Sequence, residues 1–196
     1  DGVARMTGEP SETSGRGGSR PEDYPPAYRS GFGDEGAAAL EAFVKNGGTL
    51  VTFAQAGDLP IQKFGLPVRN LLAGLSSTEF WSPGSTLKVN IDRTNALAYG
   101  MPADGLATFL GGNQVYEVVA TPRNDRVKRI VTFIDRDILQ SGWLIGEDVI
   151  AEKAAMVSVQ HGLGQVVLIG FRVQHRAQTH GTFKLFFNAL IGTRVP

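Results

Sequence analysis

Hydrophobic and polar residues alternate along most of the chain at the spacings of short strands and amphipathic helices. The first clear pattern is a helix over residues 35–46, with Asp34 as its N-cap, because four apolar residues recur on one face. These residues are Ala37, Leu40, Phe43 and Val44. Asn46-Gly47-Gly48 suits a helix exit, and residues 49–54 (TLVTFA) predict a buried strand. A helix, a glycine exit and a strand in this order are half of a parallel α/β unit.

Further short elements follow with the same alternation. The predicted strands are residues 85–91, 114–120, 129–134, 155–160 and 165–171. The predicted helical segments are 56–64, 94–99 and 179–191, and residues 67–75 fit neither pattern. The turn His161-Gly162-Leu163-Gly164 has the form of a hairpin connection.

Residues 1–33 differ from the rest of the chain. Gly, Ser, Pro, Glu and Arg dominate this stretch, which has too few apolar residues to offset the entropy of ordering it. The sequence therefore predicts a flexible tail or linker over residues 1–33 and one α/β domain over residues 34–196. The cluster of Tyr24, Pro25, Pro26 and Tyr28 is a candidate for docking onto that domain.

Composition narrows the chemistry. The 19 basic residues balance the 19 acidic ones, which gives no electrostatic reason to expect nucleic acid or an anionic membrane as a partner. No apolar run approaches the roughly 18 residues that a membrane helix needs. The chain has no cysteine, so disulfides, thiolate metal sites and a cysteine nucleophile are excluded.

Four segments together resemble one group of proteins. They are FVKNGGTLVTF (Phe43–Phe53), FGLPVRNLLAGL (Phe64–Leu75), SGWLIGED (Ser141–Asp148) and GFRVQHRAQTHGTFKLFFNAL (Gly170–Leu190). The chain resembles, from about Tyr24 to Ile191, the class I glutamine-amidotransferase-like domain that follows the catalytic domain of bacterial zinc carboxypeptidase-family proteins. The last motif is long and specific, whereas NGGTLV alone is common to many flavodoxin-like domains.

The resemblance implies a flavodoxin-like, doubly wound α/β sheet, mostly parallel with one antiparallel hairpin. It also implies a shape related to trehalose-utilisation-type domains and to the trimerisation domain of some β-galactosidases. Such domains begin with one or two βα units, and residues 1–33 show no such strands. Either the chain is N-terminally truncated, or those strands lie upstream in a parent protein. If they are absent, the sheet should have an uncovered edge, which favours pairing with another chain.

The same resemblance transfers no catalytic residue. Class I amidotransferases use a Cys with a His and a Glu, and this chain lacks the Cys. Zinc carboxypeptidases use a His-x-x-Glu pair, and none of His161, His175 and His180 begins one. The resemblance therefore implies zinc in the parent's peptidase domain, no cofactor in this chain, and a periplasmic or secreted location.

One loop is chemically rich. It holds Arg172, Gln174, His175, Arg176, Gln178, Thr179 and His180, between the last strand and the last helix. Ligands of open α/β sheets sit outside the carboxyl ends of strands, and a helix N-terminus favours an anion. The loop is thus a candidate site for a carboxylate, phosphate or sugar acid. The alternative is structural: Thr179 caps the last helix, and the Arg and His side chains brace the loop or an interface.

Other candidate sites are weaker. A metal site would combine His175 and His180, five residues apart, with His161. Glu147 and Asp148 follow Trp143, but adjacent carboxylates point apart, and a solvated surface is the simpler interpretation. Trp81 with Phe80 is either a platform for a carbohydrate or a loop anchor. The basic cluster of Arg123, Arg126, Lys128 and Arg129 is interpreted as a solvated hairpin face.

These observations favour a non-catalytic accessory domain of a zinc carboxypeptidase-type protein that serves assembly or substrate access. The expected partner is the peptidase domain of the same parent protein or a second copy of the chain. The alternative is a small-ligand module for a carboxylate or carbohydrate that uses the loop from Arg172 to His180. A small hydrolase is a third hypothesis, for which the sequence offers no nucleophile–base pair.

Overall fold

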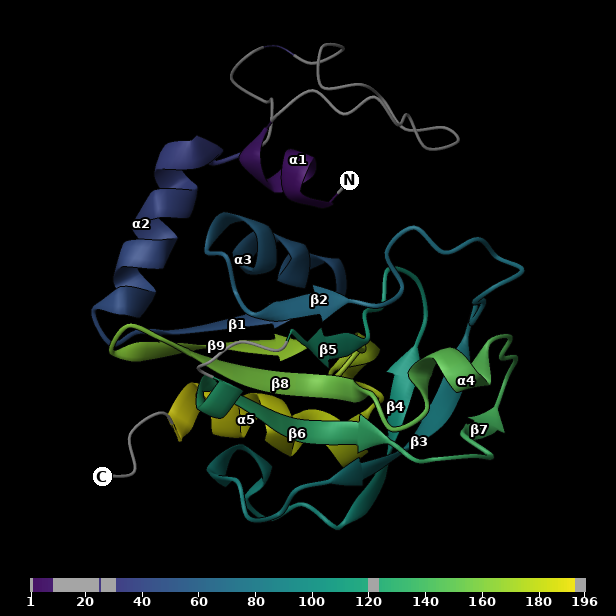
Figure 1. The fold of residues 1–196 in the computed structure, drawn as a ribbon. Helices are drawn as coiled ribbons and strands as arrows, with labels where there is room; N and C mark the ends of the chain where they lie inside the picture. The colour runs from purple at the N-terminus through teal and green to yellow at the C-terminus, as the bar shows by residue number, and fades with distance from the viewer. Residues whose placement is uncertain (1, 9–24, 26–30, 120–123, 193–196) are drawn as a thin grey trace.

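A single mixed sheet organises the molecule (Figure 1). The computed structural model describes residues 2–8, 25, 31–119 and 124–192. Within these residues the main path of the sheet runs β1-β9-β8-β6-β3-β4, while β2 pairs with β5, β5 with β8, and β7 with β3. The strands are β1 (Thr49–Phe53), β2 (Val68–Asn70), β3 (Ser85–Ile91), β4 (Asp104–Phe109), β5 (Tyr116–Val118), β6 (Val127–Phe133), β7 (Leu139–Ser141), β8 (Ala154–His161) and β9 (Gly164–Ile169).

Helices cover both faces of the sheet (Figure 1). The α-helices are α1 (Gly2–Thr7), α2 (Gly33–Lys45), α3 (Asp58–Lys63), α4 (Glu147–Ile150) and α5 (Phe183–Ile191). The 3-10 helices are η3 (Ala54–Gly57), η4 (Ala96–Ala98), η5 (Asn124–Arg126), η6 (His175–Ala177) and η7 (His180–Thr182). In the described part of the chain, no helix has the length and apolar character needed to cross a bilayer.

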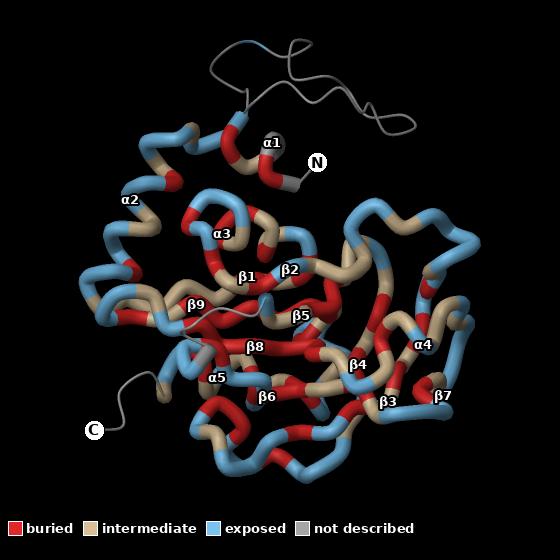
Figure 2. The backbone as a smooth tube through the Cα atoms, viewed as in Figure 1, coloured by how far each residue is buried: buried red, intermediate tan, exposed pale blue. Residues whose placement is uncertain are grey.

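Two apolar cores lie on opposite faces of the sheet. On one face, Val44 of α2 packs in one cluster with Val157 of β8 and Leu168 of β9. On the other face, Leu185 and Ala189 of α5 belong to the larger cluster, which also takes in β3, β4 and β6. Figure 2 shows β8 and β9 almost entirely buried, whereas β1 beside them is only half-buried. The sheet is therefore well covered at its centre and less covered at β1.

The prediction of a mostly parallel sheet is wrong for the described residues. Only β1 and β9 pair in parallel, from Thr49 beside Gln165 to Phe53 beside Ile169. The other strand pairs are antiparallel. For β8 and β9 the cause is their short connection: the chain turns at Gly162, whose φ of 64° suits a tight turn, whereas a parallel pair needs a crossover of a dozen or more residues.

Several predicted elements are confirmed within a few residues. They are the helix α2, the strands β1, β3, β5, β6, β8 and β9, and the hairpin between β8 and β9. Helix α2 begins at Gly33, so Asp34 is not its N-cap; the Asp34 carboxylate instead accepts a hydrogen bond of 2.8 Å from Lys63. The last α-helix begins at Phe183 and not at Thr179, because two 3-10 turns precede it.

The N-terminal stretch contains a helix that the composition does not predict. Val3 and Met6 of α1 pack against Ala37 of α2 and Leu59 of α3. The amide of Phe32 donates to the carbonyl oxygen of Met6 at 2.9 Å, which ties the start of α2 to this helix. The docking cluster around Tyr24 and Tyr28 lies outside the described residues, apart from the exposed Pro25.

The outer edge of β1 is unpaired within the described residues. The N–H of Gln165 donates to the carbonyl oxygen of Gly48 at 3.1 Å, and this bond determines which residues of β1 hydrogen-bond to β9. Backbone groups alternate in direction along a strand, so Leu50 and Thr52 face β9, while Thr49, Val51 and Phe53 point their N–H and C=O groups away from it. In the part of the chain that the structure describes, no strand therefore pairs with the outer side of β1.

Candidate functional site

Three chain segments meet at the carboxyl ends of the parallel strands β1 and β9. The first follows β1 through η3, and the second, from Arg172 to His180, follows β9. The third, residues 111–114, is held between them, because the N–H of Gln114 donates to the carbonyl oxygen of Gly170 at 2.8 Å. Ligands of open α/β sheets bind at such a place, so this edge is the candidate site.

The loop from Arg172 to His180 is largely braced by its own hydrogen bonds. The guanidinium of Arg172 donates to the carbonyl oxygen of Gly111 at 2.7 Å. The hydroxyl of Thr179 donates to the carbonyl oxygen of Val173 at 2.9 Å and caps no helix. His180 contacts the carbonyl oxygen of Ala177 through Nε2 at 2.5 Å, and its ring lies edge-on to Phe183. For these three residues the bracing role is the one that the contacts support.

The remaining residues of the loop have other surroundings. Gln174, Arg176 and Gln178 are exposed and His175 is half-buried, and within the described residues none of the four has a side-chain hydrogen bond. Arg176 and Ala177 both have a positive φ, 47° and 54°, a conformation that costs a non-glycine residue energy. The loop is therefore held in a strained turn with polar side chains directed to solvent.

The elbow after β1 carries no reactive group. Ala54 is buried and has a φ of 48°, so the chain turns sharply from the strand into η3 at this residue. Class I amidotransferases place a cysteine at a strand-to-helix elbow, whereas here the side chain is a methyl group. This elbow therefore carries no nucleophile.

A buried polar set behind this edge escaped sequence analysis. Gln114 donates through Nε2 to Oδ1 of Asp58 at 2.6 Å, and its Oε1 accepts from the hydroxyl of Tyr116 at 2.9 Å. Gly57 allows this approach, since a Cβ there would lie 2.5 Å from Oε1 of Gln114. The set joins the start of α3 to β5, and no local pattern signals it because Asp58 and Gln114 lie 56 residues apart.

Burial controls the ionisation of this set. It raises the pKa of Asp58 from its ordinary value, and the hydrogen bond from Gln114 offsets this only in part. Burial also raises the pKa of Tyr116, with a further increase from the nearby Asp58 carboxylate. Tyr116 is thus a neutral hydrogen-bond donor, which suits a structural link between elements more than proton transfer.

The histidines do not converge on a metal site. His161 lies at the opposite end of β9 from His175, where its Nε2 contacts Oε1 of Glu41 at 2.9 Å and its ring stacks on Phe64. Among the described residues, no group of three or more His, Asp or Glu side chains could hold a metal ion. The combination of His161 with His175 and His180 is therefore wrong.

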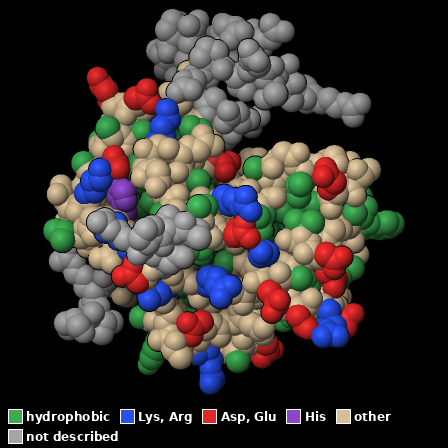
Figure 3. All heavy atoms as spheres, viewed as in Figure 1, with side chains coloured by type: hydrophobic (Ala, Val, Ile, Leu, Met, Phe, Trp, Pro, Cys, Tyr) green, Lys and Arg blue, Asp and Glu red, His purple; other side chains and the backbone are tan. Residues whose placement is uncertain are grey.

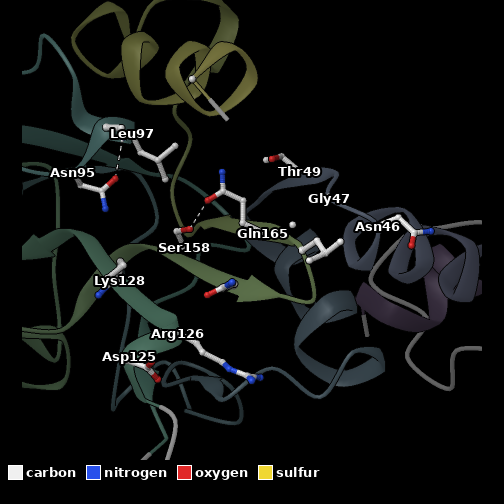
Figure 4. A pocket seen from close by; sticks show the side chains of 15 residues that line it. Asn46, Gly47, Thr49, Asn95, Leu97, Asp125, Arg126, Lys128, Ser158 and Gln165 are labelled. Carbon is white, nitrogen blue, oxygen red and sulfur yellow. Dashed lines mark hydrogen bonds between the residues drawn. The ribbon is translucent and has the colours of Figure 1, made fainter. Parts of the chain in front are cut away.

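A polar pocket of about 530 Å³ lies at the other end of the sheet (Figure 4). The hydroxyl of Ser158 donates to Oε1 of Gln165 at 2.8 Å in its wall, and Thr49 of β1 lies nearby. Arg126 and Lys128 of the predicted basic cluster also line it, and both are exposed. The pocket is open, and the basic residues belong to a solvated face, as the sequence predicts for the described part of that cluster.

The two tryptophans form a partly exposed pair. Their rings are 5.8 Å apart and tilted by 67°, with Trp81 39% and Trp143 59% exposed. The backbone of Trp143 is fixed by Ser85, whose hydroxyl donates to its carbonyl oxygen at 2.6 Å and accepts from its N–H at 3.0 Å. Figure 3 shows hydrophobic side chains gathered at right, over the region of β3, β4 and α4, with acidic ones around them. Glu147 and Asp148 are the first two residues of α4. Glu147 is half-buried and Asp148 is exposed, so the two carboxylates do not form a convergent pair.

No family model matches this chain, and no curated protein matches it. Among solved structures, a ThuA-like protein from Parabacteroides merdae aligns with a TM-score of 0.50 and 13% identity, over 84% of this chain and 69% of that one. A GMP synthase-type protein from Thermoplasma acidophilum gives 0.48 and 11%, over 81% and 64%. The β-galactosidase from Rahnella sp. R3 gives 0.48 and 18%, over 80% of this chain.

The chain spans about a fifth of the length of that β-galactosidase and of the Bacillus circulans enzyme, which matches with a TM-score of 0.46. At these identities the similarity concerns the fold alone. None of these structures bears on the resemblance to zinc carboxypeptidases, which stays a prediction. The described part of the chain thus has a mixed α/β fold similar to that of a ThuA-like protein.

Proposed function

We propose that this chain is a non-catalytic accessory domain that serves assembly within a zinc carboxypeptidase-type protein. The observation that carries the proposal is the outer edge of β1, where the backbone groups of Thr49 and Val51 and the N–H of Phe53 have no partner among the described residues. An unpaired, uncharged edge is a template for pairing with another strand. The parent protein would hold its zinc in a separate peptidase domain, as the resemblance implies.

The carboxyl edge of the sheet supports the non-catalytic half of the proposal. At the elbow Ala54 offers a methyl group, and His180 is engaged with Ala177. Acyl transfer needs a nucleophile within hydrogen-bond reach of a base, and the described residues of this edge supply no such pair. Arg172, which suits a carboxylate chemically, is directed to the carbonyl oxygen of Gly111.

The direct test is an assay of the purified chain for peptide hydrolysis, with its zinc content measured on the same sample. We expect no hydrolysis above buffer and no stoichiometric zinc. Hydrolysis that depends on zinc bound to this chain would overturn the proposal. A zinc carboxypeptidase assayed in parallel serves as the positive control for the substrate and the conditions.

A second candidate function is binding of a carboxylate or carbohydrate by the Arg172–His180 loop. It is favoured by Gln174, Arg176 and Gln178, which are exposed and make no side-chain hydrogen bonds to described residues. A ligand at a hundred times its Kd stabilises a protein by roughly 2.7 kcal/mol, which a thermal-shift screen detects. A shift that Arg176→Ala removes without unfolding the domain would favour binding, and no shift with any carboxylate or sugar would exclude these ligands.

A further inference from the structure

We infer that the open edge of β1 pairs antiparallel with the same edge of a second copy of this chain, around a two-fold axis at Val51. The inference rests on the proposed assembly function and names its partner. Three features of the described residues carry it: the direction of the backbone groups of β1, the absence of charge along the strand, and apolar side chains that flank the edge on both faces of the sheet.

The backbone of β1 is self-complementary. Thr49, Val51 and Phe53 point their N–H and C=O groups outward, because the alternate residues face β9. In an antiparallel pair centred on Val51, each Val51 exchanges both hydrogen bonds with the Val51 of the second copy. Thr49 then lies opposite Phe53 of that copy, so its carbonyl oxygen can accept from the N–H of that Phe53, whose own carbonyl oxygen opens η3 in its chain.

Among the described residues, the edge lacks the features that keep sheet edges apart. Natural edges are protected by lysines, prolines, bulges or a covering segment. β1 has the sequence TLVTF, without charge or proline, and its register with β9 is regular from Thr49 to Phe53. On the neighbouring helix α2, the charges of Glu41 and Lys45 pair with each other at 2.8 Å. A two-fold axis at Val51 therefore brings no like charges of β1 together.

Helix α5 presents apolar side chains beside the edge on one face of the sheet. Its opposite side faces η4, because Lys184 donates to the carbonyl oxygen of Gly100 and Asn188 to those of Leu97 and Tyr99. Phe186 lies against Phe53 at the end of β1, with ring centroids 5.2 Å apart. Leu190, one turn later on the same side, is 54% exposed. The flank toward β1 is thus apolar, and no described element covers it.

Helix α2 presents apolar side chains beside the edge of β1 on the other face of the sheet. Val44 faces the sheet, and Glu41 reaches His161 in the β8–β9 turn, which places the inner flank of the helix. Phe43 lies on the flank opposite Glu41, where its ring packs over Gly48 just before β1 and stays 55% exposed. Ala39 and Ala42 beside it are exposed and small, so a second helix can approach closely. A second copy would cover both flanks in a single contact.

The first experiment measures the molar mass of the chain by light scattering after gel filtration. We expect twice the 21.0 kDa of the monomer. Val51→Pro removes only an outward N–H, which edge strands tolerate, and should weaken dimerisation at least about tenfold, because two hydrogen bonds are lost at the axis. Val51→Ala keeps the N–H and should stay dimeric. A monomeric wild-type chain would overturn the inference, and so would a Val51→Pro variant that folds and dimerises as tightly as the wild type.

A second pair of variants keeps the test independent of proline. Leu190→Lys places a charge on the flank beside β1 and should weaken the dimer, whereas Leu163→Lys places it in the β8–β9 turn, at a residue 83% exposed, and should not. Equal effects of the two lysines would contradict the proposed surface.

Disulfide trapping locates the axis itself. The chain has no cysteine, so Val51→Cys introduces a single thiol. Directly opposite residues in a hydrogen-bonded antiparallel pair have Cα atoms about 5.5 Å apart, within the range for a disulfide. Mild oxidation should link Val51→Cys into covalent dimers and leave Leu163→Cys monomeric. A chain that is monomeric and does not hydrolyse peptides would refute the second copy as the partner but not the proposed accessory function. Zinc-dependent hydrolysis by the chain would refute the accessory function, whatever the oligomeric state.

Discussion

The buried link between Asp58, Gln114 and Tyr116 makes a quantitative prediction about stability. Gln114→Leu keeps the approximate size of the side chain but removes both hydrogen bonds, one of 2.6 Å to Asp58 and one of 2.9 Å from Tyr116. The tyrosine hydroxyl is then left without a partner in a site from which water is excluded, since Tyr116 and Gln114 are both almost fully buried. The half-buried Asp58 can recover part of its loss from solvent.

The expected cost follows from these surroundings. A buried hydroxyl left without a partner costs about 1–3 kcal/mol, and the exposed side of Asp58 limits the second loss to about 1 kcal/mol. Gln114→Leu should therefore lower the free energy of unfolding by about 2–4 kcal/mol. Tyr116→Phe should cost less, about 1–2 kcal/mol, because it leaves one amide oxygen unpaired. The double variant removes both partners and should cost less than the sum of the two single variants.

Urea unfolding, followed by the fluorescence of the two tryptophans and by circular dichroism, measures these differences. The slopes should stay equal among the variants, so that changes in midpoint report stability. A Gln114→Leu variant within about 0.5 kcal/mol of the wild type would refute the reasoning, as would a double variant equal to the sum of the single ones. Either result would mean that the three side chains do not act as one buried unit.

Two further predictions test the electrostatics and the packing. Burial raises the pKa of Asp58, so the folded state holds this proton more tightly than the unfolded state, and the contribution of Asp58 to stability falls as the pH rises through its folded pKa, above 3.8. Asp58→Asn keeps the oxygen that accepts from Gln114 but cannot ionise. As the pH rises from about 4 to about 7, this variant should therefore lose less stability than the wild type in urea titrations. A steeper loss in the variant would contradict this. Leu185→Ala should cost about 2–5 kcal/mol of stability, because Leu185 of α5 is fully buried. Leu163→Ala, at an exposed turn, should change stability by less than about 0.5 kcal/mol. Thermal unfolding that ranks the two variants otherwise would refute the assigned core.

Local patterns predicted the elements that bury one face of a regular strand or helix. β3 alternates between buried and half-buried or exposed residues along its whole length, and its predicted bounds are those of the structure. β4 was missed because its sequence, DGLATF, contains Asp and Gly and buries only Ala107 and Phe109. α1 was missed because the prediction used the average composition of residues 1–33, which is polar and rich in glycine. The six residues of α1 are a small part of that stretch, and their apolar side chains pack against α2 and α3.

Strand direction and site assembly were beyond local patterns. One helix and one buried strand suggested a parallel sheet, but direction depends on which strands become neighbours, and the short β8–β9 turn makes that pair antiparallel. The sequence around Thr179 suits a helix cap, but two 3-10 turns precede α5 in the structure. The hydroxyl of Thr179 therefore donates to the carbonyl oxygen of Val173 and does not cap the last helix. The Asp58–Gln114 contact needs the tertiary fold, because nothing in either neighbourhood specifies the other.

The proposed assembly depends on the outer edge of β1, and amide exchange followed residue by residue by NMR tests this edge directly. The amides of Leu50 and Thr52 face β9 and should be protected at every protein concentration. The amides of Val51 and Phe53 face outward and should exchange quickly in dilute samples, then slow as the concentration rises and the edge becomes paired. If Val51 and Phe53 exchange at the same fast rate at all concentrations, while the chain remains folded, the edge is not an assembly surface for this chain and the central claim is wrong.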